Sequence, residues 1–128
     1  MAYQNTQIIS FVSGEALDGF TFVKVNNVGK VVKCTAATDL PIGVAQRACE
    51  SGDAVEVVIA GLTKVIAGGV TTCATDHFVM PGLAGKAYKW ADGAGVENPV
   101  GRFIPNQNLL ASADSVEILV NFNPQLGK

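Results

Sequence analysis

Hydrophobic and polar residues alternate with a period of two along several short stretches of the chain. In the segment DAVEVVIA, Val55, Val57 and Ile59 share a face opposite Glu56. In the segment VEILVNF, four apolar side chains share one face: Val116, Ile118, Val120 and Phe122. Such alternation is typical of β-strands that bury one face. Burying four side chains of this kind contributes about 6–12 kcal/mol before the entropy cost is subtracted.

Further strand candidates are short and are separated by turn-forming residues. The segments 19–25 and 29–35 flank NNVG, whose asparagine and glycine suit positive backbone angles, so together they predict a hairpin. The segments 86–91 and 100–104 are also predicted strands. Short strands between frequent glycine-rich turns indicate an all-β sandwich or barrel. We therefore predict an all-β fold, a small β-barrel or sandwich.

The segment 42–65, IGVAQRACESGDAVEVVIAGLTKV, carries the strongest pattern and predicts a β-hairpin. Gly43 is expected where a side chain would crowd a neighbouring strand. CESGD is expected to form a tight turn, and the long strand after it is expected to end or bulge at Gly61. The following LTKVIAGG either continues this strand or returns along it. The pattern indicates a scaffold rather than a site of chemistry.

One domain accounts for the chain, because 128 residues suit a single core and no linker or second compositional regime occurs. The polar, unpatterned residues 1–7 are expected to form a flexible N-terminal arm. Residues 8–128 are then the single β domain. Helical signals are confined to 37–41, which could hold one turn, and 106–114, which could hold one or two.

The composition excludes some functions and favours others. The net charge is −2 and no run of Lys or Arg occurs, which argues against binding to nucleic acid. No stretch approaches the roughly 20 apolar residues that span a bilayer, and the N-terminus lacks the features of a secretory signal, so we expect a protein made in the cytoplasm. Charged residues are 16% of the chain, against roughly 25% in typical domains. This favours a surface partly covered by other subunits over a monomer coated with uncharged polar residues.

Candidate catalytic and metal-binding residues are sparse. The three cysteines, Cys34, Cys49 and Cys73, are odd in number and widely spaced, so they predict buried thiols rather than disulfides. Cys73 and the only histidine, His77, lie four residues apart in CATDH. A metal site needs three or four ligands, and a nucleophilic cysteine needs a base and usually an orienting group. No phosphate-binding glycine motif occurs. We therefore predict no catalytic residue, metal or cofactor.

Two aromatic residues suggest contacts with partners. Trp90 follows a predicted strand and could stack on a sugar or a nucleobase, although a lone tryptophan in a small β domain more often lies in the core or at a subunit interface. We predict a subunit interface. Tyr3 lies in the polar arm, where it has no core to join, so it is expected to anchor on a partner.

The order of the glycine and valine motifs resembles that of the small capsid decoration, or cement, proteins of tailed bacteriophages. The likeness spans roughly residues 20 to 122 and does not include the arm. The matching positions are Pro41 to Ala45, Gly52 to Val57, Gly61, Ala67 to Gly69, and Pro99 to Arg102.

This resemblance implies a homotrimer that binds the major capsid protein at threefold and quasi-threefold positions outside an icosahedral head and stabilises the expanded head. The predicted capsid-binding arm consists of Ala2, Tyr3, Gln4, Asn5, Thr6 and Gln7. Two alternatives stay open. The first is another virion β module, such as a head-fibre base or a carbohydrate-binding domain. The second is a small enzyme that uses Cys73 and His77.

Overall fold

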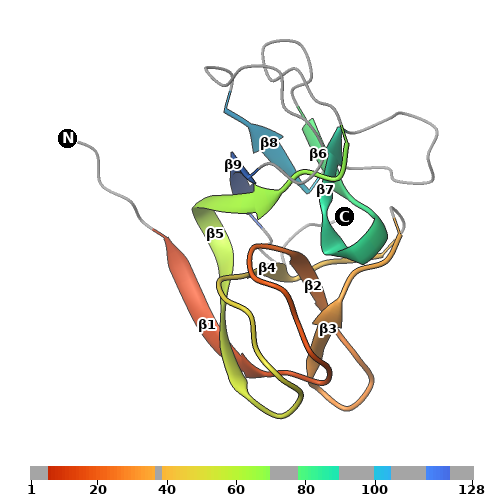
Figure 1. Ribbon diagram of the computed structural model, residues 1–128. Helices are drawn as coiled ribbons and strands as arrows, with labels where there is room; N and C mark the ends of the chain where they lie inside the picture. The colour runs from red at the N-terminus through yellow and green to blue at the C-terminus, as the bar shows by residue number, and fades with distance from the viewer. Residues whose placement is uncertain (1–5, 37–38, 70–77, 90–99, 105–114, 122–128) are drawn as a thin grey trace.

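The computed structural model describes residues 6–36, 39–69, 78–89, 100–104 and 115–121, and in these ranges it is built from β-strands (Figure 1). The elements are β1 (Gln7–Val12), β2 (Phe22–Val25), β3 (Val31–Lys33), β4 (Gly43–Ala45), β5 (Ala54–Ile66), β6 (Phe78–Pro81), the 3₁₀ turn η1 (Leu83–Gly85), β7 (Ala87–Lys89), β8 (Gly101–Phe103) and β9 (Ser115–Asn121). The prediction of an all-β fold is confirmed. The helical turns predicted at 106–114 lie outside the described residues. Of the other predicted turn, residues 39–41 are described and are not helical.

Within the described residues, the strands form one nine-stranded antiparallel sheet in which β5 pairs with β1, β4 and β9. Its order is β3-β2-β4-β5-β9-β8-β6-β7, and β1 also pairs with β5. The first half of β5 pairs with β1 and β4, and its second half pairs with β9. Figure 1 shows β1 to β4 gathered around the first half of this strand and β6 to β9 around the second. The long alternating segment therefore organises both halves of the fold.

Isolated bridges curl the sheet at both ends. Ser13, just after β1, pairs with Val31 of β3, which links β1, β5, β4, β2 and β3 in a ring of pairings. Ala67, just after β5, pairs with Ala87 of β7, which links β5, β9, β8, β6 and β7 in the same way. In this curled form, the sheet resembles the small β-barrel that the sequence predicted.

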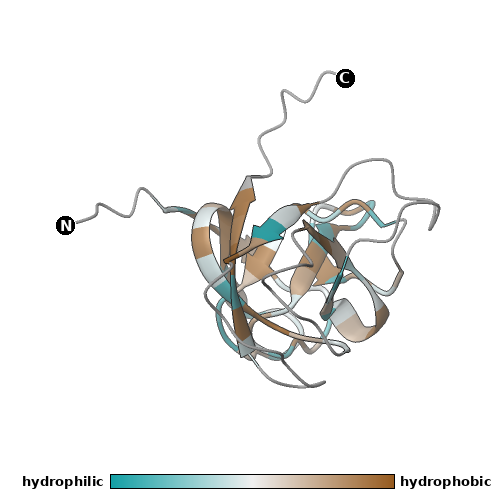
Figure 2. Ribbon diagram, turned by 90° about the horizontal axis from the view of Figure 1, so that it is seen from above, coloured by the Kyte–Doolittle hydropathy of each residue, from teal (hydrophilic) through white to brown (hydrophobic). Residues whose placement is uncertain are grey.

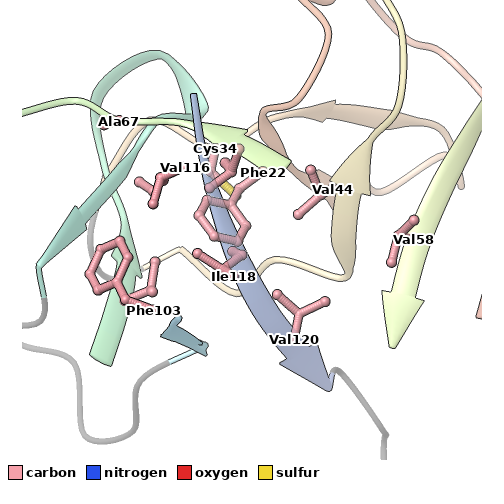
Figure 3. Packing of buried hydrophobic residues seen from close by; sticks show 12 residues of the cluster. Phe22, Cys34, Val44, Val58, Ala67, Phe103, Val116, Ile118 and Val120 are labelled. Atoms are coloured by element: carbon pink, nitrogen blue, oxygen red, sulfur yellow. The ribbon is translucent and has the colours of Figure 1, made fainter. Parts of the chain in front are cut away.

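Among the described residues, the buried side chains form two clusters that meet across β5. The larger cluster includes Phe22, Cys34, Val44, Val58, Val65, Ala67, Val79, Ala87, Phe103, Val116, Ile118 and Val120 (Figure 3). The smaller cluster includes Leu17, Val23, Val31, Ala45, Cys49, Val55 and Val57. Figure 2 shows that hydrophobic residues predominate on the strands.

The structure confirms the predicted buried face of β9 over its described residues, but it does not confirm a single buried face for β5. Val116, Ile118 and Val120 are buried as predicted, and Phe122 lies outside the described residues. The prediction of one buried face for β5 is wrong, because Val57 and its neighbour Val58 are both buried and belong to different clusters. Adjacent residues in a strand point to opposite faces, so the curled sheet covers β5 on both sides.

The predicted hairpin of residues 42–65 is confirmed as the β4–β5 pair. Val44 lies opposite Val58, and a Cβ atom at Gly43 would overlap Val57 and lie 2.5 Å from the carbonyl oxygen of Val58. Glycine at this position lets the two backbones approach. The CESGD turn contains Gly52 at φ +91°, and the strand continues through Gly61 to its end at Ile66.

The predicted β2–β3 hairpin is also confirmed. The side-chain oxygen Oδ1 of Asn26 accepts hydrogen bonds from the backbone amides of Val28 and Lys30, both at 3.0 Å. Gly29 adopts φ +83°, a conformation that costs glycine little. The local chemistry of NNVG therefore fixes this turn.

The AGG motif has a packing role that involves Tyr88 of β7. A Cβ atom at Gly68 or at Gly82 would overlap the ring of Tyr88, whereas one at Gly69 would lie at an ordinary 3.8 Å from it. The tyrosine ring therefore packs against the backbones of both glycines. This contact holds β7 against the segment that follows β5, next to the bridge between Ala67 and Ala87.

Candidate partner-binding surface

The first strand, β1, presents apolar side chains to solvent on both faces. Ile8 is 54% exposed and Ile9 is 45% exposed, and as neighbours in a strand they point to opposite faces. Val12 at the other end is also exposed. The strand sequence, QIISFV, contains no charged residue and no proline. Natural edge strands usually carry such residues because these discourage pairing with another chain.

One edge of β1 pairs with β5, and among the described residues no strand pairs with its other edge. An extended peptide can add to such an edge through main-chain hydrogen bonds, with alternate side chains providing specificity. The exposed isoleucines would contribute apolar burial to that pairing. We therefore regard β1 as the candidate surface for a partner strand.

The root of the predicted arm lies at the start of this strand. Gln7 already belongs to β1 and pairs with Ala60, so the strand begins one residue earlier than the predicted boundary at Ile8. Thr6 is also placed, and it lies against Gly61 of β5. The rest of the predicted arm lies outside the described residues: Ala2, Tyr3, Gln4 and Asn5.

Next to β1, the negative charge of Glu56 is offset by the positive charge of Arg47. Ser10 of β1 lies opposite Glu56 of β5, and Glu56 accepts a hydrogen bond of 2.9 Å from Nε of Arg47. The hydrogen bond from Arg47 holds the pKa of the Glu56 carboxyl below its usual value. The same guanidinium also donates to the carbonyl of Ala54. Both side chains are about half exposed, so this pair adds little to stability, but it offsets the negative charge beside the exposed strand.

A second apolar row crosses the outer face of the other half of the sheet. Arg102 of β8 lies opposite both Leu119 of β9 and Phe78 of β6. Leu119 is 50% exposed and Phe78 is 42% exposed. The guanidinium carbon of Arg102 lies 5.9 Å from the centre of the Phe78 ring, within cation–π range. This row is a candidate for a subunit contact, which the sequence assigned to Trp90 instead.

The described cysteines are buried, as the sequence predicted, and neither forms a disulfide in the structure. Cys34 is fully buried in the larger cluster, and Cys49 is buried in the smaller one. Burial raises the pKa of the Cys34 thiol to about 12, with the nearby Asp39 carboxylate adding to the rise and Lys24 opposing it. A thiol in this state is a poor nucleophile. Cys73 and His77 lie outside the described residues, as does Trp90.

We expect Cys34 to resist alkylation in the folded protein, because at pH 8 only about one thiol in ten thousand with such a pKa is ionised. Mass-spectrometric mapping of alkylated peptides before and after denaturation measures this directly. Cys34 should be modified only after unfolding. Modification at equal rates in the two states would contradict its assignment to the core.

The described residues contain no group of three or more His, Cys, Asp or Glu side chains that could hold a metal ion. They also contain no helix long and apolar enough to cross a membrane.

Two features of the candidate surface were not predicted from the sequence. A pair of isoleucines in the uncharged stretch QIISFV was a usable signal for an exposed edge, because nothing in that stretch protects it from pairing. The contact between Thr6 and Gly61 had no local signal, since it joins residues far apart in the chain.

Comparison with solved structures identifies a similar fold. The crystal structure of the head fiber gp8.5 N base of bacteriophage phi29 superposes with a TM-score of 0.69, covering 92% of this chain and 96% of that chain at 14% sequence identity. The likeness therefore extends over nearly the whole of both chains and concerns the fold. No protein-family model matches the sequence, and no curated protein sequence matches it.

Proposed function

We propose that this chain is a structural protein of a bacteriophage virion that decorates the outer surface of the capsid and stabilises the expanded head. The observation that supports this most strongly is the whole-chain similarity in fold to a phage head-fibre base. The exposed, uncharged edge of β1 supports a role in binding other proteins. The motif order that resembles cement proteins favours decoration over other virion roles.

The mechanism rests on strand addition and on avidity. The arm, Ala2 to Gln7, and the adjoining β1 pair with an exposed strand of the major capsid protein, and Tyr3 fills a pocket there. Three weak arms on one trimer bind strongly together, because the second and third bind intramolecularly. A protein that binds only the expanded shell stabilises that shell by mass action.

The proposed assembly is a homotrimer. Its support is the low charge fraction of 16% and the exposed apolar row of Leu119 and Phe78, which another subunit would cover. Sedimentation equilibrium at micromolar concentration should give three times the chain mass of 13.3 kDa. A monomer in solution that also fails to form trimers on capsids would contradict this assembly.

A head-fibre base is the second candidate, and the similarity in fold to the head-fibre base of phi29 favours it. Both candidates place the protein on the phage head, but they differ in purpose. A fibre base attaches a further structure to the head, whereas a cement protein strengthens the shell itself.

The stability of heads with and without the protein separates these two functions. Expanded heads that lack the protein should release their DNA at a lower temperature than the same heads after saturation with it. The temperature difference should disappear when binding is prevented. Saturated heads that are no more stable than bare heads would contradict the cement function and favour the fibre base.

A further inference from the structure

Thr6, at the root of the arm, lies against Gly61 of β5. A Cβ atom built at Gly61 would lie 2.8 Å from Oγ1 of Thr6 and 2.9 Å from its Cα. Because one of these atoms belongs to the backbone, rotation of the threonine side chain could not relieve the overlap. Gly61 also has φ +116°, a conformation that favours glycine. Thr6 therefore lies where any other residue at position 61 would place its side chain.

The strand register changes at the same point. Ile8 pairs with Val58, but Gln7 pairs with Ala60, so one step along β1 corresponds to two steps along β5. A bulge of this kind bends the strand and increases its local twist. The bulge and the close approach of Thr6 to Gly61 thus coincide at the position where the arm meets the β body.

We propose that Gly61 is a positioning residue for the partner-binding arm. The missing side chain lets Thr6 lie against β5, and this contact fixes the point and direction in which the arm leaves the fold. The inference rests on the proposed function, because it takes the arm to be the segment that binds the capsid. A side chain at position 61 would displace Thr6 while leaving the pairs between Ile8–Val12 and β5 intact.

The variant Gly61→Ala tests this inference, with Gly52→Ala as its matched control. Gly52 also has a positive φ, +91°, but a Cβ atom there would meet nothing within 4 Å. Gly52→Ala therefore measures backbone strain alone. We expect Gly61→Ala to lower the apparent affinity for expanded heads by more than about tenfold, since three displaced arms weaken the avidity together. Gly52→Ala should bind as the parent does. Equal binding by both variants would overturn the inference.

A second background tests the contact itself and does not require capsids. Deleting residues 1–6 removes all three of the closest atoms, which belong to Thr6, so Gly61→Ala should lower the Tm less in the shortened chain than in the parent. An equal loss of Tm in both backgrounds would show that Thr6 is not what position 61 must accommodate, and would overturn the inference. If the parent chain does not bind heads, the proposed function fails, and this comparison of Tm values still decides whether Gly61 positions Thr6.

Discussion

Gly43→Ala is expected to destabilise the protein by about 3 kcal/mol, at the upper end of the usual cost of overpacking. The added methyl group would overlap Val57 and lie 2.5 Å from the carbonyl oxygen of Val58. A carbonyl oxygen in a paired strand cannot rotate away, so β4 and β5 would have to separate. These strands join the two buried clusters, through Val44 and Val58 in one and Ala45 and Val57 in the other. A Tm lower by about 10 °C is expected in thermal unfolding.

Gly69→Ala is the matched control for this prediction. A Cβ atom at Gly69 would lie 3.8 Å from the ring of Tyr88, an ordinary contact, so this variant should unfold within about 1 kcal/mol of the parent. If Gly43→Ala and Gly69→Ala unfold at the same temperature, the close approach of β4 to β5 is not required for the fold.

Deleting Ala2 to Asn5 is expected to abolish binding to heads while leaving the β body folded. The deletion ends before Thr6 and Gln7, which contact β5, so the pairs of β1 are retained. The Tm should therefore stay nearly unchanged. Cosedimentation with expanded heads measures the binding, and circular dichroism measures the Tm. Native occupancy by the truncated protein would assign binding to the β body instead, most directly to the exposed edge of β1.

Tyr3→Ala gives a smaller version of the same test. Loss of an anchoring aromatic costs about 2 kcal/mol for each arm, and three arms in one trimer multiply that loss. Gln4→Ala is its control, because only alternate side chains of an added strand face the partner. Equal binding by the two variants would exclude Tyr3 as the anchor.

Local sequence patterns were sufficient to predict most of the strands and their turns, but they did not predict β1 or β6. The hairpin at Asn26 and Gly29 was predictable because its determinants are local. The Asn26 side chain accepts hydrogen bonds from backbone amides two and four residues later, and Gly29 adopts a positive φ. The alternation of Val116, Ile118 and Val120 was sufficient to predict β9 because this strand buries one face. The requirement for Gly43 was also predictable, since a glycine within a strand pattern often marks a close backbone approach.

Contacts between distant segments were not predictable from the sequence. The burial of Val58 depends on the curl of the sheet around β5, and the bridges that produce this curl join residues far apart in the chain. Position 68 requires glycine because a side chain there would overlap the ring of Tyr88. Position 61 requires glycine because Thr6 occupies the space that a side chain would fill. The exposed edge of β1 differs from these contacts, because the uncharged stretch QIISFV gives a local signal for it.

Cosedimentation of the purified protein with expanded and with unexpanded heads of its own phage tests the central proposal most directly. We expect saturable binding to expanded heads and none to unexpanded heads, because a cement protein stabilises the expanded shell by binding it selectively. Binding should be lost in the chain that lacks Ala2 to Asn5. Equal binding to both kinds of head, or no binding to either, would contradict the proposed cement function.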